Sequence, residues 1–414
     1  MMKYEKYKAS EIHWLSQIPA HWEVKRVKDL GEYQSGEYIN ANEFDEENLY
    51  PVYGGNSFRG FANKYNTEGD YVLIGRQGAL CGNINYGSGK FWATEHCVVV
   101  YHKRKINVKW LGELLRIMNL NQYATSTAQP GLSVEKIKRL ELPVPSYEEQ
   151  TAIAQYLDAK TQAIDKKINL LTKKAETYKE LRKSIINDVV CKGLDKNVKL
   201  KESGIDWIGK IPEHWKISRI KDSFNLFTGN SISDKALFER KENSIDYVST
   251  KDIDVDTGRI TYDNGVYIPK KDKSFKIAKA NSILICIEGA NAGKKIGFTN
   301  KDICFVNKLC AIKSRTKNNS DKYFYYFTQS PLFEKQFFAI LNGLIGGVSL
   351  NSIKYFDIIS PTKEEQTSIA NYLDEKTQKI DAIVSNIGKQ IDTLKELRKT
   401  LINDVVTGKI MVNG

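Results

Sequence analysis

The sequence predicts a mixed α/β protein with a pseudo-twofold internal repeat. Two globular domains would be joined by two long helices that form an antiparallel coiled coil. The segment from Glu148 to Val190 returns as Glu364 to Val406, an offset of 216 residues, and 26 of the 43 aligned positions are identical. A long two-copy repeat of this kind predicts a molecule built from two related halves.

The repeated segments carry the apolar pattern of a coiled coil. Apolar residues recur at alternating spacings of four and three residues, as in the seam of paired helices. At 1.5 Å per residue each helix would be roughly 65 Å long. The predicted seam residues are Leu157, Ile164, Ile168, Leu171, Tyr178 and Ile185 in the first copy, and Leu373, Ile380, Val384, Ile387, Leu394 and Leu401 in the second.

Polar residues interrupt both seams at matching places, Thr161 with Thr377 and Arg182 with Arg398. They would either fix the register of the helices or lie at a loosely packed end with their charged groups in water. Further apolar residues lie beside the seam and predict a second docking surface, as expected for a protein partner. They are Leu170, Leu181, Ile186, Leu397 and Ile402.

Four segments follow from the repeat: domain 1 (1–146), a first long helix (147–193), domain 2 (194–362) and a second long helix (363–414). Each domain opens with the pattern W-[LI]-x-x-I-P-x-H-W-x-[VI]-x-R-[VI]-K-D, beginning at Trp14 and at Trp207. Its histidines, His21 and His214, could be catalytic, but no Ser, Cys or carboxylate partner stands near them in a recognisable motif. The preferred interpretation is a Trp/His/Pro cluster that packs the start of each domain.

Within the domains, a buried strand is followed by a Gly-rich turn in both copies, Asp70–Gly82 and Asn281–Gly293. A second buried strand is expected at Val98–Val100 and at Cys310–Ile312. Before each long helix comes a G-[LV]-S-x-x-x-I-K segment, whose Ser133 and Ser349 are predicted to be helix N-caps.

Composition narrows the class of protein. The chain has 414 residues and a formal net charge of +12, which favours an anionic partner, most commonly nucleic acid. No apolar run is long enough to span a bilayer and the N-terminal residues lack the apolar stretch of a signal peptide, so no membrane partner is expected. The six cysteines form no C-x-x-C pair, as expected for a reducing compartment, and the predicted location is cytoplasmic.

No catalytic or metal-binding motif stands out. Gly289-Ala-Asn-Ala-Gly293-Lys294-Lys295 resembles a phosphate-binding loop, but it has one residue too few between the glycines and Lys295 where Ser or Thr should bind Mg²⁺. Asp234 with Glu239-Arg240-Lys241 resembles a nuclease triplet, yet such triplets arise by chance in a Lys-rich chain and are more simply a solvated helix face. We therefore predict no catalytic residues, no metal and no cofactor in this chain.

The duplicated opening motif, the G-[LV]-S approach and the E-E-Q-T-x-I-A-x-Y-L-D helix together resemble the specificity (S) subunit of Type I restriction-modification systems. The resemblance covers essentially the whole chain, in the family's order. It implies that each domain is a target recognition domain that reads one half of a bipartite double-stranded DNA target. It also implies two adenine methyltransferase (M) subunits and endonuclease/translocase (R) subunits as partners, which would hold S-adenosylmethionine, ATP and Mg²⁺.

The candidate base-reading residues lie in and beside the Gly-rich loops: Arg76, Gln77, Asn291, Lys294, Lys295 and Lys308. Arg can pair with guanine, and Gln or Asn with adenine, although each residue taken singly is more simply a plain surface residue or a phosphate contact. The helix pair is expected to set the distance between half-sites. Two alternatives stay open, namely a nuclease or methyltransferase acting alone and a coiled-coil scaffold that binds only proteins.

Overall fold

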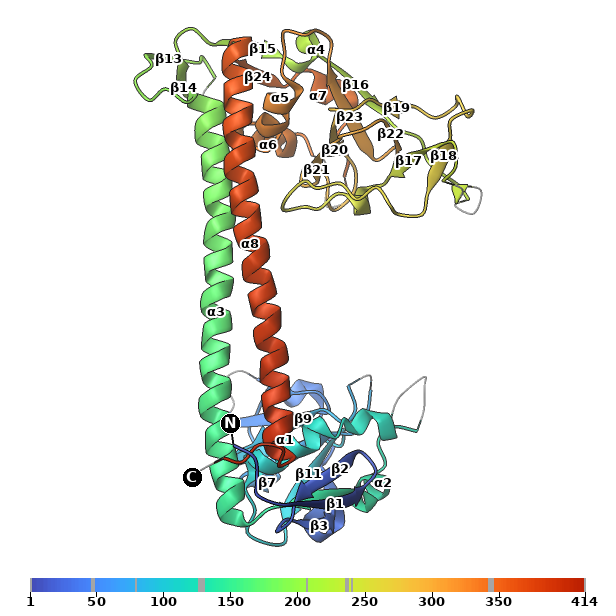
Figure 1. Cartoon of the computed structure of the whole chain (residues 1–414), viewed down its shortest axis with the longest axis vertical. Coiled ribbons are helices and arrows are strands. Elements are labelled where there is room, and N and C mark those ends of the chain that lie inside the picture. Colours follow the sequence, from blue (N-terminus) through green and yellow to red (C-terminus); the bar gives the residue numbers. More distant parts are fainter. Residues whose placement is uncertain are drawn as a thin grey trace. The chain divides into compact units, whose positions relative to one another are not determined.

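The structure is a computed structural model that describes residues 2–412 apart from 46–48, 79, 126–130, 206–207, 235–237, 240 and 342–345. Trp207 of the second opening motif, Ala79 and Arg240 lie outside the described residues. Two compact units are present. Unit 1 is Met1–Leu170 with Gln390–Gly414, and unit 2 is Leu171–Lys389. Each unit thus contains one globular domain, the start of one long helix and the end of the other (Figure 1).

Domain 1 is built on two four-stranded sheets. The first has the order β4-β11-β8-β9 and is antiparallel throughout. The second has the order β6-β5-β10-β7, in which β5 and β10 run parallel. The strands are β4 (Gly31–Ser35), β5 (Tyr50–Tyr53), β6 (Phe58–Ala62), β7 (Thr67–Glu68), β8 (Tyr71–Gly75), β9 (Ile84–Gly87), β10 (Lys90–Ala93) and β11 (Cys97–His102).

Domain 2 repeats both sheets in the same order, β16-β23-β20-β21 and β18-β17-β22-β19, again with one parallel pair, β17 and β22. The divergent sequences of the two domains therefore form one duplicated fold, as predicted. The strands are β16 (Phe224–Thr228), β17 (Ser244–Val248), β18 (Tyr267–Pro269), β19 (Ile277–Ala278), β20 (Ile283–Cys286), β21 (Ile296–Phe298), β22 (Ile303–Phe305) and β23 (Leu309–Ser314). The buried strands expected before and after the Gly-rich turns are β8 and β11, and β20 and β23.

Smaller elements complete each domain. Two-stranded ladders join β1 (Tyr7–Ile12) to β2 (Leu15–Pro19), β3 (Glu23–Arg26) to β12 (Glu141–Val144), β13 (Leu200–Glu202) to β14 (Lys210–Pro212) and β15 (Lys216–Arg219) to β24 (Asp357–Ser360). The helices are η1 (Val27–Asp29), η2 (Ala41–Glu43), α1 (Val108–Ile117), η3 (Leu120–Tyr123), α2 (Val134–Arg139), α4 (Ile220–Ser223), η5 (Thr250–Asp252), α5 (Asp321–Thr328), α6 (Pro331–Ala339) and α7 (Leu350–Lys354). As predicted, Ser133 and Ser349 occupy the N-cap positions of α2 and α7. Ser349 Oγ accepts from the N–H of Ser352, whereas the Ser133 side chain forms no capping hydrogen bond.

The two long helices are α3 (Tyr147–Lys192) and α8 (Lys363–Val406). In unit 1 the start of α3 packs with the end of α8, and the core includes Leu157 and Leu401. In unit 2 the start of α8 packs with the end of α3, and the core includes Leu373 and Val190. The helices therefore pair antiparallel, because a start meets an end in both units.

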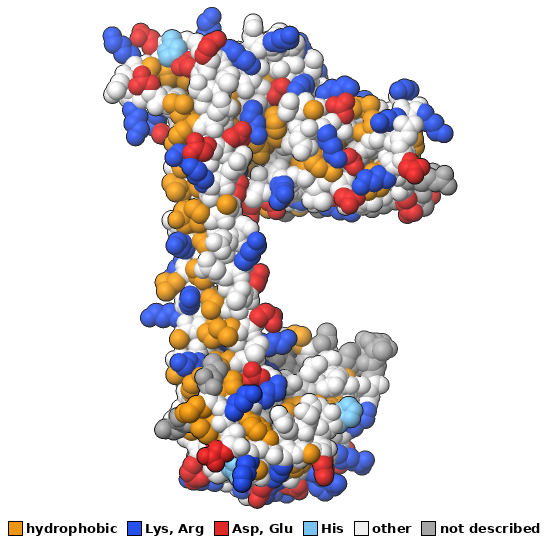
Figure 2. Space-filling model, in the orientation of Figure 1, with side chains coloured by type: hydrophobic (Ala, Val, Ile, Leu, Met, Phe, Trp, Pro, Cys, Tyr) orange, Lys and Arg blue, Asp and Glu red, His pale blue; other side chains and the backbone are white. Residues whose placement is uncertain are grey.

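Burial along the helices separates two sets of residues. All twelve predicted seam side chains are buried or half-buried. Ile186 and Ile402 were expected beside the seam on a free surface, which is wrong: they are 1% and 5% exposed, inside the cores of units 2 and 1. Leu170, Leu181 and Leu397 are 59%, 45% and 49% exposed, and hydrophobic side chains are visible along the helices in Figure 2.

Each domain has one of two equivalent glycines at which the backbones of its two sheets approach closely. Gly36 follows β4 and Gly229 follows β16. A Cβ atom at Gly36 would lie 2.0 Å from the carbonyl oxygen of Ala93, and one at Gly229 would lie 1.8 Å from that of Phe305. Both positions need glycine because the backbones approach too closely for any side chain.

Replacing Gly229 by Ala is therefore expected to lower the free energy of unfolding by about 1–3 kcal/mol, because the sheets must move apart. The matched variant is Gly388→Ala on α8, where a Cβ meets nothing within 4 Å. There alanine should raise the free energy of unfolding by about 0.5–1 kcal/mol through helix propensity. Urea unfolding of both variants measures the two effects, and equal stabilities would contradict the close approach at Gly229.

Candidate functional site

The first turn of each long helix binds the opening motif of its own domain through a glutamate. Glu149 accepts hydrogen bonds from Tyr4 Oη (2.5 Å) and His21 Nε2 (3.1 Å). Glu365, 216 residues later, accepts them from His214 Nε2 (2.9 Å) and Trp215 Nε1 (3.1 Å). Each histidine therefore has a carboxylate partner that its local sequence did not indicate, and the two side chains stay 58% and 47% exposed.

Beside the shared histidine, the two glutamates differ in their second side-chain partner. Trp22 Nε1 is buried without a hydrogen-bond partner among the described residues, and in unit 1 Tyr4 occupies the place that Trp215 takes in unit 2. Burial alone would raise the pKa of Glu365, but the hydrogen bonds from His214, Trp215 and Thr362 outweigh it and lower that pKa. Glu365 therefore stays an anionic acceptor at neutral pH.

A buried glutamine follows each glutamate and joins the helix to the rest of the domain. Gln150 accepts from the backbone N–H of Asn107 (3.0 Å) and donates to the carbonyl of Pro145 (3.0 Å). Gln366 accepts from the N–H of Ser320 (2.8 Å) and donates to the carbonyl of Pro361 (3.0 Å). Because Asn107 and Ser320 are the N-caps of α1 and α5, each glutamine fixes a domain helix against the long helix.

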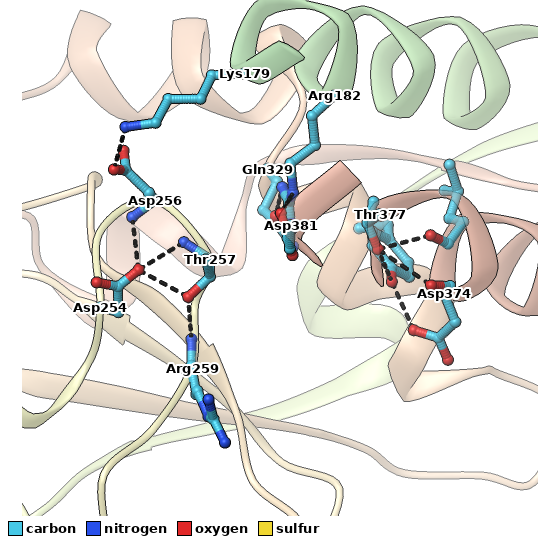
Figure 3. A network of polar contacts seen from close by, with 12 residues as sticks. Lys179, Arg182, Asp254, Asp256, Thr257, Arg259, Gln329, Asp374, Thr377 and Asp381 are labelled. Carbon is cyan, nitrogen blue, oxygen red and sulfur yellow. Dashed lines mark hydrogen bonds and ion pairs between the residues drawn. The ribbon is translucent and has the colours of Figure 1, made fainter. Parts of the chain in front are cut away.

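Two turns further on, ion pairs reinforce the same contact. Lys109 Nζ of α1 lies 3.1 Å from Asp158 Oδ1, and Lys322 Nζ of α5 lies 3.0 Å from Asp374 Oδ1. In unit 2 Tyr326 Oη also donates to Asp374 (2.5 Å) and lies 3.1 Å from Thr377 Oγ1. Asp374 and Thr377 are labelled in Figure 3.

The opening motif also contacts the end of the other long helix. A Cβ atom at Gly408 would lie 2.5 Å from Pro19 Cδ and 3.0 Å from the ring of Trp22. In unit 2 a Cβ at Gly193 would lie 3.1 Å from the ring of Trp215. Each domain therefore holds the start of one long helix and the end of the other, which makes the opening motif a clamp on both.

Arginine–aspartate pairs link the two long helices within each unit. Arg182 Nε lies 3.0 Å from Asp381 Oδ1 in unit 2, and Arg398 Nε lies 3.1 Å from Asp165 Oδ1 in unit 1. The residue numbers of both pairs add to the same total, as facing residues of antiparallel helices in one register must. These contacts support the register interpretation of the polar seam positions.

The Gly-rich loops lie against the G-[LV]-S segments in both domains. Gln77 forms an isolated antiparallel bridge with Gly131, and Glu288 forms the equivalent bridge with Gly347. The N–H of Leu132 donates to the carbonyl of Arg76 (2.8 Å). The N–H of Val348 donates to the carbonyl of Ile287 (2.9 Å) in the same way. Two sequences with different side chains are thus presented on one backbone frame.

The candidate base-reading residues fall into two groups. Gln77, Asn291, Lys294 and Lys308 have exposed side chains, and the carbonyl of Lys308 accepts from the N–H of Ile287 (2.9 Å), which brings it to the second loop.

The other two candidate side chains are engaged within the protein. Arg76 is half-buried and its Nη1 donates to Ser35 Oγ (3.0 Å). Lys295 Nζ donates to the carbonyl of Thr250 (2.9 Å).

Lys294 lies beside α3 and α8, where it lines a cavity with Lys179 and Lys183.

The structure adds residues that the sequence did not indicate. Tyr4, for example, lies outside every repeat, so no pattern pointed to its bond with Glu149. The described residues contain no group of three or more His, Cys, Asp or Glu that could hold a metal ion. None of the described helices is long and apolar enough to cross a membrane.

The buried glutamines offer a direct test of the helix junction. Gln366→Ala leaves the Ser320 N–H and the Pro361 carbonyl without their partner, so the free energy of unfolding should fall by about 1–3 kcal/mol. Gln150→Ala should behave alike, whereas the exposed Gln378→Ala on the same helix should change it by less than about 0.5 kcal/mol. Urea unfolding compares the three; a Gln366 variant as stable as the Gln378 variant would refute the junction.

Comparison with known proteins matches this duplicated architecture. Residues 19–174 and 212–393 match the family model for the Type I restriction modification DNA specificity domain. The Type I restriction enzyme MjaVIII specificity subunit of Methanocaldococcus jannaschii is 25% identical over 442 residues, which cover 100% of this chain and 98% of that protein. The EcoprrI specificity subunit of Escherichia coli is 45% identical over 138 residues, but these span only 32% of this chain and 34% of that protein.

Solved structures agree in fold. One solved chain matches with a TM-score of 0.72 at 15% identity, and the match covers 95% of this chain and 99% of that one. It belongs to a structure described as the structural basis underlying complex assembly and conformational transition of the type I R-M system. The HsdS subunit from Thermoanaerobacter tengcongensis has a TM-score of 0.52 at 16% identity, covering 99% and 100%. Because the two family matches together span well over half of the sequence, the chain belongs to the Type I restriction-modification DNA specificity family.

Proposed function

We propose that this chain is the sequence-reading subunit of a Type I restriction-modification complex, in which domain 1 reads one half of a bipartite DNA target and domain 2 reads the other. The observation that carries the proposal is the pair of Gly-rich loops. Their backbones are held by matching bridges, while the exposed side chains differ between the domains. A common backbone frame with different side chains suits two recognition domains that bind different half-sites.

DNA affinity would come from the positive charge and sequence preference from the loops. The net charge of +12 favours phosphate contacts, which position a protein without specifying sequence. Gln77 and Asn291 are exposed amides that can pair with adenine in the major groove, and Lys294 and Lys308 can contact guanine or phosphate. Arg76 would have to release Ser35, and Lys295 would have to release Thr250, before either could reach a base.

The long helices would serve as spacer and as docking surface. The contacts that hold the start of each helix, through Glu149, Glu365, Gln150 and Gln366, favour a fixed connection. Leu170, Leu181 and Leu397 remain exposed on these helices, and burying them would favour a protein partner such as a methyltransferase subunit.

Catalysis would belong to other chains. In this proposal the chain is non-catalytic and directs adenine methylation and DNA cleavage by its partners in the cytoplasm, as a defence against foreign DNA. The partners would be two methyltransferase subunits together with endonuclease/translocase subunits. S-adenosylmethionine, ATP and Mg²⁺ would act on those subunits, and this chain's own residues would bind and orient the DNA.

Co-expression with a methyltransferase subunit in a methylation-free host, followed by mapping of methylated adenines, tests this function. We expect a split motif with a fixed spacer. Asn291→Ala should relax one half-site only, with a loss of discrimination of about 1–3 kcal/mol at one base pair. Gln77→Ala is the matched variant for the other half-site. A stable complex that methylates a single continuous motif, or none, would contradict the proposal.

Lengthening both helices tests the spacer role. Seven residues inserted after Lys173 in α3 and after the equivalent Lys389 in α8 keep the heptad pattern and add roughly 10 Å. The mapped motif should then gain about three base pairs between unchanged half-sites. Methylation at the original spacing by the lengthened chain would show that the helices do not determine the spacer.

A further inference from the structure

Domain 2 contains a loop that domain 1 lacks. We call residues 249–266, which connect β17 to β18, the strap loop. The equivalent connection in domain 1, between β5 and β6, is only Gly54–Ser57. The strap loop accounts for most of the extra length of domain 2, and it lies beside α3 (Figure 3).

The strap loop has a defined shape of its own. Asp254 Oδ1 accepts from the N–H groups of Asp256 (3.2 Å) and Thr257 (2.8 Å) and from Thr257 Oγ1 (2.7 Å). The backbone N–H of Asp254 donates to the carbonyl of Arg259 (2.9 Å), and this hydrogen bond closes the turn. Such Asx turns fix the backbone locally, so a contact made at the tip of the loop can restrain the domain that carries it.

The loop is also seated on its own domain. Tyr325 Oη of α5 donates to the carbonyl of Thr257 (3.5 Å). Gly258 has a φ of +68°, and a Cβ there would lie 2.4 Å from Tyr325 Oη and 2.5 Å from the carbonyl of Ile296. Only glycine fits this position, because both the backbone conformation and the close approach exclude a side chain.

From this seat the loop reaches α3. Lys179 Nζ lies 2.6 Å from Asp256 Oδ2, and one turn later Arg182 Nη1 donates to Gln329 Oε1 at the end of α5 (3.1 Å). A cavity of about 580 Å³ lies between the strap loop, the long helices and the domain. These polar contacts therefore bridge a gap that packed apolar side chains do not fill.

The charges around the contact are mixed. Asp254, Asp256 and Asp381 face Lys179 and Arg182, and burial, with the two strap-loop carboxylates, raises the pKa of Asp381 despite the neighbouring Arg182. The cavity is also lined by Lys183, Lys294 and Glu334. Carboxylates outnumber cations at the contact itself. Removing Lys179 would therefore leave Asp256 of the strap loop without its ion-pair partner.

Unit 1 gives the matched comparison. The repeat equivalents of Lys179 and Arg182 are Lys395 and Arg398. Lys395 pairs with Asp392 of its own helix (3.9 Å), and Arg398 pairs with Asp165 of α3. Within the described residues, neither forms a hydrogen bond or ion pair with domain 1. In the described part of the chain, these repeat-equivalent side chains thus form polar contacts with their domain in unit 2 but not in unit 1.

We propose that Lys179 and Asp256 are positioning residues that hold domain 2 against the helix pair at a second point, so that its half-site is read at a stricter distance from the helices. This inference rests on the proposed function, since it concerns how one recognition domain is oriented. Its contribution is modest, because an exposed ion pair contributes little. The consequence is that the two domains differ in how firmly they are held.

The test compares Lys179→Glu, Asp256→Lys, the double swap Lys179→Glu/Asp256→Lys, and Lys395→Glu as the matched control, each in complex with the methyltransferase subunit. Affinity is measured for the mapped target and for duplexes whose spacer is one base pair longer or shorter. Hydrogen exchange of the backbone amides at 250–261 is followed in the same complexes. Each single reversal should lower the preference for the correct spacer roughly two- to five-fold and speed exchange.

The double swap should restore both readouts, and Lys395→Glu should leave both unchanged. Equal effects of the reversals at Lys179 and Lys395 would overturn the proposal, because a general charge effect would then explain them. Faster exchange without a change in spacer preference would overturn it too. If the parent complex itself shows no spacer preference, the proposed function fails together with this inference, whereas the other two failures leave that function intact.

Discussion

The docking of each long helix on its domain is the constraint on which the rest of the structure depends. A glutamate and a buried glutamine in the first turn bind the opening motif, a domain helix N-cap and the preceding proline carbonyl. Leaving any of these buried groups unpaired would be costly, so one relative arrangement is strongly favoured. The tryptophan of the same motif then packs on the glycine that ends the other long helix.

This arrangement explains why some segments are duplicated almost unchanged while others diverge. Residues that join domain to helix, such as Gln150 with Gln366 and Asp158 with Asp374, face the same partners in both units and recur as identical residues. Exposed loop side chains such as Gln77 and Asn291 face solvent, so the fold leaves them free to differ. In the proposed function, two different surfaces on one repeated frame would serve to recognise an asymmetric target.

The repeat also makes departures from symmetry visible. The strap loop gives domain 2 an additional contact with α3, and Tyr4 gives domain 1 a hydrogen bond that Trp215 makes in domain 2. Ile186 and Ile402 look in sequence like part of an exposed stripe, yet the domain cores cover them. Periodicity alone cannot tell which partner buries an apolar residue, because a helix shows the same stripe to any neighbour.

The sequence by itself determined the two-copy architecture, the long paired helices and the positions of the buried strands. These depend on local spacing and on patterns that are visible along the chain. Only the tertiary structure decided the order of the sheets, the contact of the Gly-rich loops with the G-[LV]-S segments, and the partners of His21 and His214. Each of these joins residues far apart in sequence, and no local pattern encodes which distant group completes a hydrogen bond or fills a core.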